Sequence, residues 1–267
     1  MPVALAHLEH PAAQAEREPP LLIAHGLFGS ARNFNTIGRR LANTRRVILV
    51  DMRNHGESPW DPDNSYPAMA GDLAEAIGRL GGGRATLLGH SMGGKAAMTL
   101  ALTSPELVAG LIVADIAPVP YEHSHLGHIE AMKEADLSKI TRRSDADPML
   151  AEAVPDRMLR AFLLQNLVVE DGRARWRINL DALAGNMDAM LGFPGDLPEP
   201  AFEGPAYFLH GGESPYAAPG THSRIRALFP AAEIEALPGA GHWLHAEQPD
   251  AFVEQVEGWL RGAQGAA

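Results

Sequence analysis

The segment from Ala85 to Met98, ATLLGHSMGGKAAM, decides the expected fold of this chain. It begins with a short apolar run typical of a strand, ends with a helix-compatible run, and joins them through residues 89–93, GHSMG. A serine held in so sharp a turn has strained backbone, so glycine is needed two positions before and two after it. The pattern predicts a nucleophile elbow, in which Ser91 projects above the N-terminus of the next helix and developing negative charge is stabilised.

Short apolar runs alternate with helix-compatible segments along most of the remaining chain. The expected strands are 21–24, 47–51, 85–89, 111–115, 206–210 and 233–237, and the expected helices are 33–42, 69–79, 92–103, 221–228 and 251–260. Continuous Val, Ile and Leu runs of this length are typical of buried parallel strands. The alternation therefore predicts an α/β protein with a mostly parallel central sheet and helices on both faces.

The alternation stops between Pro118 and Pro205, where amphipathic pieces replace the strand patterns. We expect residues 1–118 and 205–267 to form the α/β core, and residues 119–204 to form a helical cap inserted into it. Ligands of open α/β sheets bind beyond the carboxyl ends of the strands, so we expect the cap to act as a lid there. Some of its apolar residues are expected either to line an acyl pocket or to pack within the cap: Phe162, Leu163, Trp176, Met187, Met190 and Phe193.

The composition excludes several classes of function. With 33 acidic against 22 basic residues, the net charge of −11 repels polyanions, which argues against nucleic acid as a partner. The absence of cysteine excludes disulfides, thiolate metal sites and a cysteine nucleophile. Since the sequence also shows no signal-peptide pattern and no membrane-spanning segment, we expect a cytoplasmic protein. Nothing in the sequence indicates a particular oligomeric state.

A serine nucleophile needs a base within hydrogen-bond reach, and histidine has the appropriate pKa. Among the 12 histidines, His242 lies in a glycine-containing loop, residues 239–243, between the last predicted strand and the last predicted helix. We therefore predict that His242 is the general base. Three cap histidines, His123, His125 and His128, are spaced by two and three residues, so they do not share one helix face. We expect them to line a pocket or a turn, and not to bind a metal.

The histidine in turn needs a carboxylate that fixes its tautomer. After the strand that follows the cap, the usual position of this acid holds Ser214. Asp115 instead stands at the carboxyl end of the strand 111–115, next to the elbow strand, and is the predicted acid. Glu213, which has a longer side chain, is the alternative, and a purely structural Asp115 is a further one.

An acyl-transfer intermediate also needs two backbone donors for its oxyanion. The amide of Met92, directly after the nucleophile, is the first predicted donor. The amide of Leu27 is the second, because residues 25–30, HGLFGS, follow an early strand and their glycines allow close approach of the backbone.

The elbow also resembles a phosphate-binding loop in one respect. Gly89, Gly94 and Lys95 have the spacing of such a loop, but the next residue is Ala96. The hydroxyl that binds magnesium in a phosphate-binding loop is therefore missing, and we expect neither a nucleotide nor any other cofactor.

Several segments taken together resemble the α/β-hydrolase superfamily, namely residues 25–30 (HGLFGS), 51–58 (DMRNHGES), 89–94 (GHSMGG) and 241–243 (GHW). Three others are similar to the small YbfF-type esterases and their mitochondrial relatives, namely residues 115–118 (DIAP), 179–183 (NLDAL) and 212–216 (GESPY). The resemblance spans essentially the whole chain. One departure is Asn54, where the wider superfamily more often has glycine.

The resemblance implies an α/β-hydrolase fold with a helical lid, and an esterase that acts on short or medium acyl esters or thioesters. It assigns Ser91, Asp115 and His242 to the catalytic positions. It also assigns to Ser214 a hydrogen bond within their network in place of a charge.

The sequence thus predicts a cofactor-independent serine esterase whose partner is a small-molecule acyl ester. Ser91 would attack the acyl carbonyl, His242 would carry the proton, Asp115 would orient His242, and the amides of Leu27 and Met92 would bind the oxyanion. The same residues also suit cofactor-free haloperoxidase or perhydrolase chemistry and carbon–carbon bond hydrolysis. A ligand-binding protein of this fold with little turnover would keep them as well.

Overall fold

The computed structural model describes residues 1–14, 18–122, 124–195, 197 and 202–263. Its central sheet has seven strands in the order β1-β3-β2-β4-β5-β8-β9. The strands are β1 (His7–His10), β2 (Leu21–Ala24), β3 (Val47–Val50), β4 (Ala85–His90), β5 (Val108–Ala114), β8 (Ala206–Gly211) and β9 (Ala232–Leu237). All neighbouring pairs are parallel except β1 with β3. The predicted mostly parallel α/β sheet is therefore confirmed.

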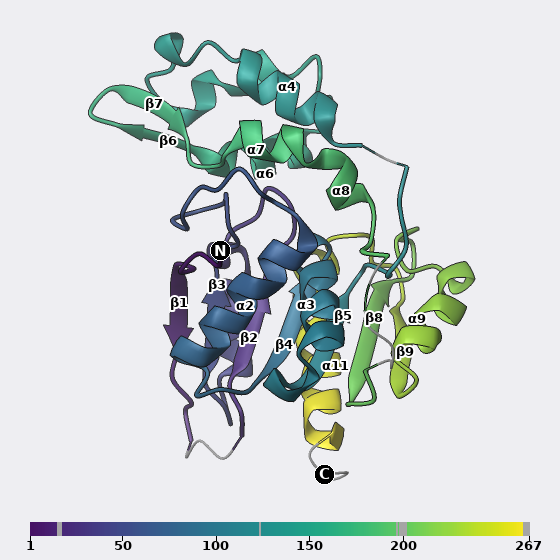
Figure 1. Ribbon diagram of the computed structural model, residues 1–267. Helices are drawn as coiled ribbons and strands as arrows, with labels where there is room; N and C mark the ends of the chain where they lie inside the picture. Colours follow the sequence, from purple (N-terminus) through teal and green to yellow (C-terminus); the bar gives the residue numbers. More distant parts are fainter. Residues whose placement is uncertain (15–17, 123, 196, 198–201, 264–267) are drawn as a thin grey trace.

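Helices cover both faces of this sheet (Figure 1). On one face lie α2 (Tyr66–Leu80), α3 (Met92–Thr103) and α9 (His222–Leu228), and on the other lie α1 (Asn35–Leu41), α10 (Leu244–Glu247) and α11 (Pro249–Ala263). The strand pleat separates the two cores. Leu22 of β2 packs with α2 and α3, whereas its neighbour Ile23 packs with α1 and α11. A fully buried Leu or Ile contributes about 1.5–3 kcal/mol, so both faces stabilise the sheet.

The sequence did not predict β1. Its four residues, HLEH, are mostly exposed and contain one aliphatic side chain, so they carry no hydrophobic signal. The strand forms because its backbone pairs with β3 at the edge of the sheet, from His7 opposite Val50 to His10 opposite Val47. Long-range pairing of this kind cannot be inferred from a local pattern.

The chain between β5 and β8 lies above the carboxyl ends of the strands (Figure 1). We refer to residues 119–204 as the cap. Its elements are α4 (Leu126–Glu134), α5 (Asp147–Leu150), α6 (Arg157–Leu163), β6 (Leu167–Glu170), β7 (Arg173–Trp176), α7 (Leu180–Gly185) and α8 (Met187–Leu191). Single 3₁₀ turns occur in core and cap at Ala31–Phe34, Pro105–Leu107, Leu137–Lys139, Arg143–Asp145, Leu164–Asn166 and Pro219–Thr221.

The cap is not wholly helical, because β6 and β7 form a separate antiparallel hairpin. The two residues between the strands, Asp171 and Gly172, have φ of 50° and 72°. An Asp-Gly pair with positive φ at both positions is the preferred two-residue hairpin turn. The expectation of a wholly helical cap is therefore wrong for residues 167–176, where the Asp-Gly pair favours a hairpin.

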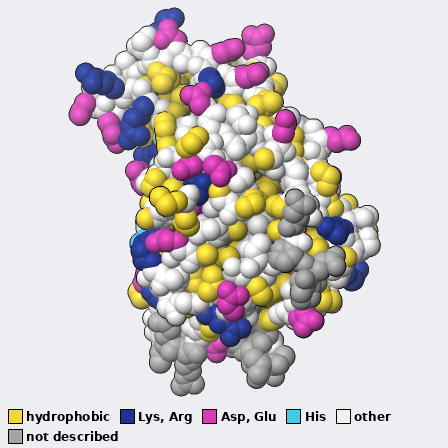
Figure 2. Space-filling model, viewed as in Figure 1, with side chains coloured by type: hydrophobic (Ala, Val, Ile, Leu, Met, Phe, Trp, Pro, Cys, Tyr) yellow, Lys and Arg dark blue, Asp and Glu magenta, His cyan; other side chains and the backbone are white. Residues whose placement is uncertain are grey.

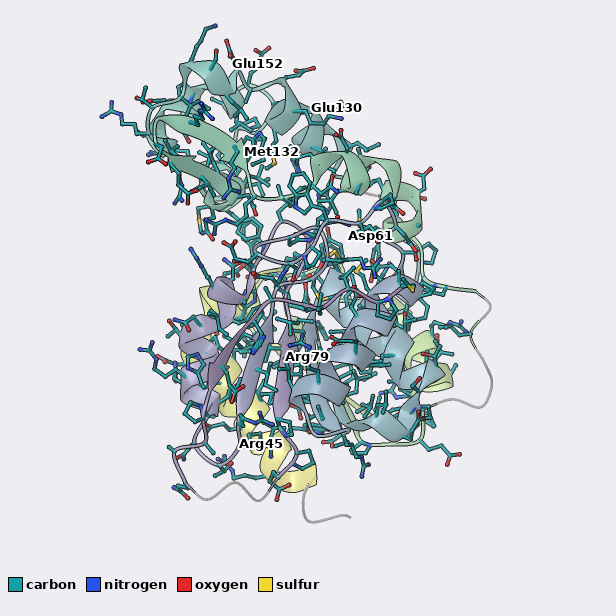
Figure 3. The ribbon with its side chains drawn as sticks, turned by 60° about the vertical axis from the view of Figure 1, so that its left-hand side comes forward. Arg45, Asp61, Arg79, Glu130, Met132 and Glu152 are labelled. Atoms are coloured by element: carbon teal, nitrogen blue, oxygen red, sulfur yellow. The ribbon has the colours of Figure 1, made fainter. Side chains whose placement is uncertain are left out.

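The cap has its own small core. Trp176 of β7 donates its indole N–H to the Met132 carbonyl at 2.8 Å, and Met132 is fully buried among cap residues. In Figure 3, Met132 lies inside the cap, whereas Glu130 and Glu152 point outward. Acidic and basic side chains also occupy much of the outer cap surface in Figure 2. The apolar sides of the cap elements therefore face one another and the core.

Asparagines attach the cap to the core. The backbone N–H of Asn179 donates to the Asn54 carbonyl at 2.9 Å, and the Asn54 side chain donates to Asn64 Oδ1 at 2.9 Å. Asn186 Oδ1 accepts from the Asn64 backbone N–H at 3.1 Å. Asn54 has a φ of 66°, which asparagine tolerates better than most residues. The Asn54 side-chain oxygen also accepts from Asn179 Nδ2 at 3.0 Å, so asparagine here keeps the turn and adds a link to the cap that glycine could not make.

No helix in the described ranges combines the length and the apolar composition needed to cross a membrane.

A buried ion pair fixes the loop that carries these asparagines. Arg53 is 1% exposed and forms a bidentate pair with Asp72 of α2, with N–O distances of 2.6 and 2.7 Å. Arg53 also donates to the Asp63 carbonyl, and Asp72 accepts from the Val3 amide. Breaking one side of such a pair leaves a charge buried without its partner, which is strongly destabilising.

We predict that Asp72→Leu lowers the free energy of unfolding by about 3–5 kcal/mol, because it removes the bidentate partner of the buried Arg53 guanidinium and leaves Asp61, 3.6 Å away, as a weaker one. Chemical denaturation followed by circular dichroism measures this change. The control is Glu75→Gln, which removes a partly exposed pair with Arg79 (labelled in Figure 3) and is expected to cost less than about 1 kcal/mol. Equal losses in the two variants would contradict the prediction.

Candidate active site

The turn between β4 and α3 has the strained geometry expected of an elbow. Ser91 has φ 51° and ψ −116°, a conformation that non-glycine residues rarely adopt. A Cβ atom on Gly89 would lie 2.3 Å from the Gly93 carbonyl oxygen, and one on Gly93 would lie 2.4 Å from the Ala24 carbonyl oxygen. Both glycines are therefore required by close backbone approach.

Ser91, His242 and Asp115 form a continuous hydrogen-bonded chain. Ser91 Oγ lies 3.2 Å from His242 Nε2, and His242 Nδ1 lies 2.6 Å from Asp115 Oδ2. An ionised carboxylate only accepts hydrogen bonds, so Nδ1 carries the hydrogen and Nε2 presents its lone pair to Ser91. The Asp115 side chain is fully buried, whereas that of His242 is 27% exposed. The imidazole thus joins a buried acid to an accessible hydroxyl.

The Asp115 carboxylate has further donors. The Gly211 amide donates to Oδ1 at 2.8 Å, and the buried Ser214 hydroxyl donates to Oδ2. Glu213 is exposed, and within the described residues its side chain makes no hydrogen bond or ion pair with His242. The structure therefore brings Asp115 and Ser214 together at His242, whereas the Glu213 side chain is not part of this hydrogen-bond network in the described residues.

The two amides predicted for the oxyanion border the same cavity as Ser91, at Leu27 and Met92. Neither amide donates a hydrogen bond to an acceptor in the described part of the chain. The loop that contains Leu27 packs closely on the elbow, since a Cβ atom on Gly26 would lie 3.2 Å from the Ser91 Cβ. Both N–H groups are thus available beside the serine.

Two buried histidines that the sequence analysis left without a role in the site hold this loop. His55 Nε2 accepts the Phe28 amide at 3.2 Å, while its Nδ1 donates to the Arg53 carbonyl. His25 in the same way accepts the Met52 amide and donates to its neighbour's carbonyl. Burial lowers the pKa of His25 to about 4 and that of His55 to about 3, so both are neutral at pH 7. Phe28 has a φ of 63°, and the bond from His55 helps to hold it there.

The loop that carries His242 is held from three sides. Glu247 accepts the amides of Gly241 and Trp243 at 2.6 and 3.1 Å. His90 Nε2 donates to the His242 carbonyl at 2.9 Å, and the Tyr216 ring lies 4.2 Å from the His242 ring, centroid to centroid. The sequence analysis missed Glu247, whose only signal is an acidic residue in the turn after the glycine-rich loop.

Ser91 lies where two cavities meet. The larger cavity, of about 370 Å³, has an apolar wall from loops and α6, formed by Phe28, Phe34, Leu159, Phe162 and Trp243. The smaller cavity, of about 50 Å³, lies beside α3 and α8 and is lined by Tyr66, Ile116, Tyr121, Met187, Met190 and Leu191. His242 borders the larger cavity and not the smaller one.

The cap residues singled out from the sequence divide between the two expected roles. Three of them line cavities, namely Phe162, Met187 and Met190. The other three belong to the apolar core, namely Leu163, Trp176 and Phe193. His125 and His128 border the larger cavity, and His123 lies outside the described residues. In the ranges that the structure describes, no group of three or more His, Cys, Asp or Glu residues is arranged to hold a metal ion.

Lys95, which matched the phosphate-loop spacing, is buried and points toward the cap. Its ammonium donates to the carbonyls of Leu191, at 3.0 Å, and Gly192, and lies 4.7 Å from the centroid of the Tyr121 ring. Burial lowers the pKa of Lys95 to about 7. The lysine therefore links α3 to the end of α8.

The chain belongs to the α/β-hydrolase fold family, whose sequence model matches residues 19–249. It is 45% identical over 250 residues to the sn-1-specific diacylglycerol lipase ABHD11 of Mus musculus, covering 91% of this chain and 81% of that one. It is 38% identical over 245 residues to esterase YbfF of Escherichia coli strain K12, covering 90% and 92%. A solved marine microorganism esterase superposes with a TM-score of 0.90 at 37% identity over 96% of this chain and 99% of that one. The predicted resemblance is thus confirmed.

His245, which lies beside the larger cavity, is expected to make the free energy of unfolding depend on pH. Its ring stacks on Phe34 at 4.3 Å between centroids, and its buried Nδ1 has no hydrogen-bond partner in the described part of the chain. Burial lowers the pKa of His245 to about 3. Between pH 6.5 and 3 the unfolded chain therefore binds a proton that the folded chain does not, and this site lowers stability as the pH falls.

We predict that His245→Phe, which keeps the stack and cannot be protonated, removes this loss. At pH 5 the variant's free energy of unfolding, relative to that at pH 8, should fall by about 2 kcal/mol less than that of the unsubstituted protein. Denaturant titrations at both pH values measure the difference. Parallel stability curves for the two proteins would show that His245 does not titrate in this way.

Proposed function

We propose that the chain is a serine esterase that hydrolyses carboxylic esters, including thioesters, of short to medium acyl chains through an acyl-enzyme on Ser91. The observation that carries this proposal is the hydrogen-bonded chain from Ser91 through His242 to the buried Asp115. Relatives named as esterase and diacylglycerol lipase, at 38% and 45% identity, support ester hydrolysis as the reaction class.

In the proposed reaction, His242 removes the Ser91 proton as Oγ attacks the acyl carbonyl. The amides of Leu27 and Met92 bind the oxyanion, and each such donor is worth roughly 3 kcal/mol in the transition state. His242 then protonates the leaving alcohol. Water enters, and the same groups transfer the acyl chain from Ser91 to it.

Asp115 fixes the tautomer of His242 and stabilises the imidazolium that forms. Ser214 has a positioning role, because its hydroxyl donates to Oδ2 of Asp115, the oxygen that also accepts from His242, while the Gly211 amide holds Oδ1. The cap acts as a lid over Ser91 and supplies part of the substrate site. The expected partner is a small-molecule ester, and the cytoplasmic location stays a prediction that cell fractionation tests.

The nucleophile is tested by a fluorophosphonate probe, which reacts with activated serines. We predict rapid labelling and hydrolysis of acyl esters, with Ser91→Ala unlabelled and its kcat reduced by up to about 10⁶-fold. Ser138→Ala, an exposed cap serine, is the matched control and should label normally. An unlabelled native protein would instead favour a ligand-binding protein with this fold.

The acid is tested by comparing two neighbouring carboxylates. We predict that Asp115→Asn lowers kcat by about 10⁴-fold, since an amide stabilises the wrong tautomer of His242. Glu213→Gln should change kcat by less than a few-fold, because Glu213 is exposed and, among the described residues, forms no hydrogen bond or ion pair with the imidazole. Steady-state kinetics with one ester measures both, and a larger loss in Glu213→Gln would reverse the assignment.

A further inference from the structure

The two cavities beside Ser91 have different access to the general base. A leaving alcohol must take its proton from His242 Nε2, so its oxygen has to lie on the imidazole side of the tetrahedral carbon. His242 borders the larger cavity only. Ser91 and Leu27 border both cavities, whereas Met92, the other predicted oxyanion donor, borders the smaller one and not the larger. The acyl substituent, which points away from the leaving group, is therefore directed into the smaller cavity.

We propose that the smaller cavity is the acyl site and the larger cavity the alcohol site, so that the protein is selective for short, unbranched, uncharged acyl groups on bulky alcohols. This inference rests on the proposed ester hydrolysis.

The volume of the smaller cavity limits the acyl chain. A group of the size of a water molecule takes up to about 30 Å³, so a cavity of about 50 Å³ holds few such groups. Short acyl groups such as acetyl fit within this limit, and octanoyl does not. The larger cavity, of about 370 Å³, has room for an aromatic or branched alcohol against Phe162 and Trp243.

Three polar side chains in the wall of the smaller cavity already donate hydrogen bonds to backbone carbonyls. Lys95 donates to the carbonyls of Leu191 and Gly192, Tyr66 donates to the Met190 carbonyl, and Tyr121 donates to the Tyr216 carbonyl. Apart from Ser91 and His125, which also border this cavity, the ligand therefore meets hydrocarbon and ring faces. A carboxylate on the acyl chain would have to compete with these carbonyls for the ammonium.

The wall formed by α8 is held in place. Asn64 donates to Met190 Sδ at 2.8 Å, Tyr66 to the Met190 carbonyl at 2.7 Å, and Lys95 to the Leu191 carbonyl at 3.0 Å. All three donors are buried residues of the core, so α8 cannot move away without leaving buried polar groups unpaired. The length limit is therefore expected to persist in solution.

The test uses two substrate series. In the first, 4-nitrophenyl esters carry acetyl, butanoyl, hexanoyl or octanoyl groups, and kcat/KM should fall at least 10-fold from butanoyl to hexanoyl, because one excess methylene in a fitted pocket costs roughly 10-fold or more. In the second, acetates of ethanol and 2-naphthol are compared, and kcat/KM should be higher for the naphthyl ester, whose ring fills the larger cavity; an equal or higher value for the ethyl ester would contradict the assignment of the alcohol site. A butanoyl ester should be preferred to the monosuccinyl ester of the same phenol.

Two substitutions of Met187 are expected to change the acyl-chain length that the smaller cavity accepts, in opposite directions. Met187 is buried in α8 and lines only the smaller cavity of the two. Met187→Ala should raise the hexanoyl-to-butanoyl ratio of kcat/KM by about 10-fold, and Met187→Phe should lower the butanoyl-to-acetyl ratio. The matched control is Phe162→Ala in the larger cavity, which should change the naphthyl-to-ethyl ratio and leave the acyl profile as it is. Fluorophosphonate labelling of Ser91 checks that each variant is folded.

Three results would overturn the assignment while leaving the esterase proposal intact: a preference for octanoyl esters, a preference for succinyl over butanoyl, or an acyl profile that moves in Phe162→Ala and not in Met187→Ala. Failure to cleave any ester, with Ser91 unlabelled, would overturn the esterase proposal itself and this assignment with it.

Discussion

The rest of the site depends on one steric constraint, the close approach of backbone around Ser91. The serine holds a positive φ because Gly89 and Gly93 leave no Cβ in the space that the Gly93 and Ala24 carbonyls occupy. The same contact brings the end of β2, and with it the loop that contains Leu27, against the elbow. A single local requirement, small residues at two positions, therefore sets both the direction of the hydroxyl and the place of the oxyanion donors.

Buried histidines and a buried aspartate surround this turn, and each holds its hydrogen-bond partners in a defined direction. His25 and His55 are neutral because burial lowers their pKa values, and a neutral imidazole with Nδ1 on a carbonyl offers Nε2 to a backbone amide. Asp115 is satisfied by an amide, a hydroxyl and the imidazole of His242. The site is thus organised by groups that keep one hydrogen-bond direction at pH 7, which reduces reorganisation during a reaction.

The cap is connected to the core in two different ways. Side chains of Asn64, Tyr66 and Lys95 hold α8 through hydrogen bonds. On the other side of the cap, Phe162 of α6 packs on Trp243, 5.6 Å between ring centroids. The 3₁₀ turn after α6 bonds to the core through Gln165, which accepts from Asn33, and through a buried bond from Asn166 to the Phe28 carbonyl at 2.8 Å. Aromatic packing such as that of Phe162 on Trp243 adapts more readily than buried hydrogen bonds, so this part of the wall is the one suited to variable groups.

The sequence by itself determined the positions of six strands along the chain, the elbow at residues 89–93 and the choice of Ser91, because these follow from local spacing and from steric rules that act over a few residues. It also indicated Asp115 over Glu213, since the end of a strand next to the elbow strand is a position that topology implies. Tertiary structure alone decided three further features: the edge strand β1, the contact of Lys95 with the end of α8, and the division of the site into two unequal cavities. Each of these depends on contacts between segments far apart in the chain, and such contacts leave no periodic pattern in either segment.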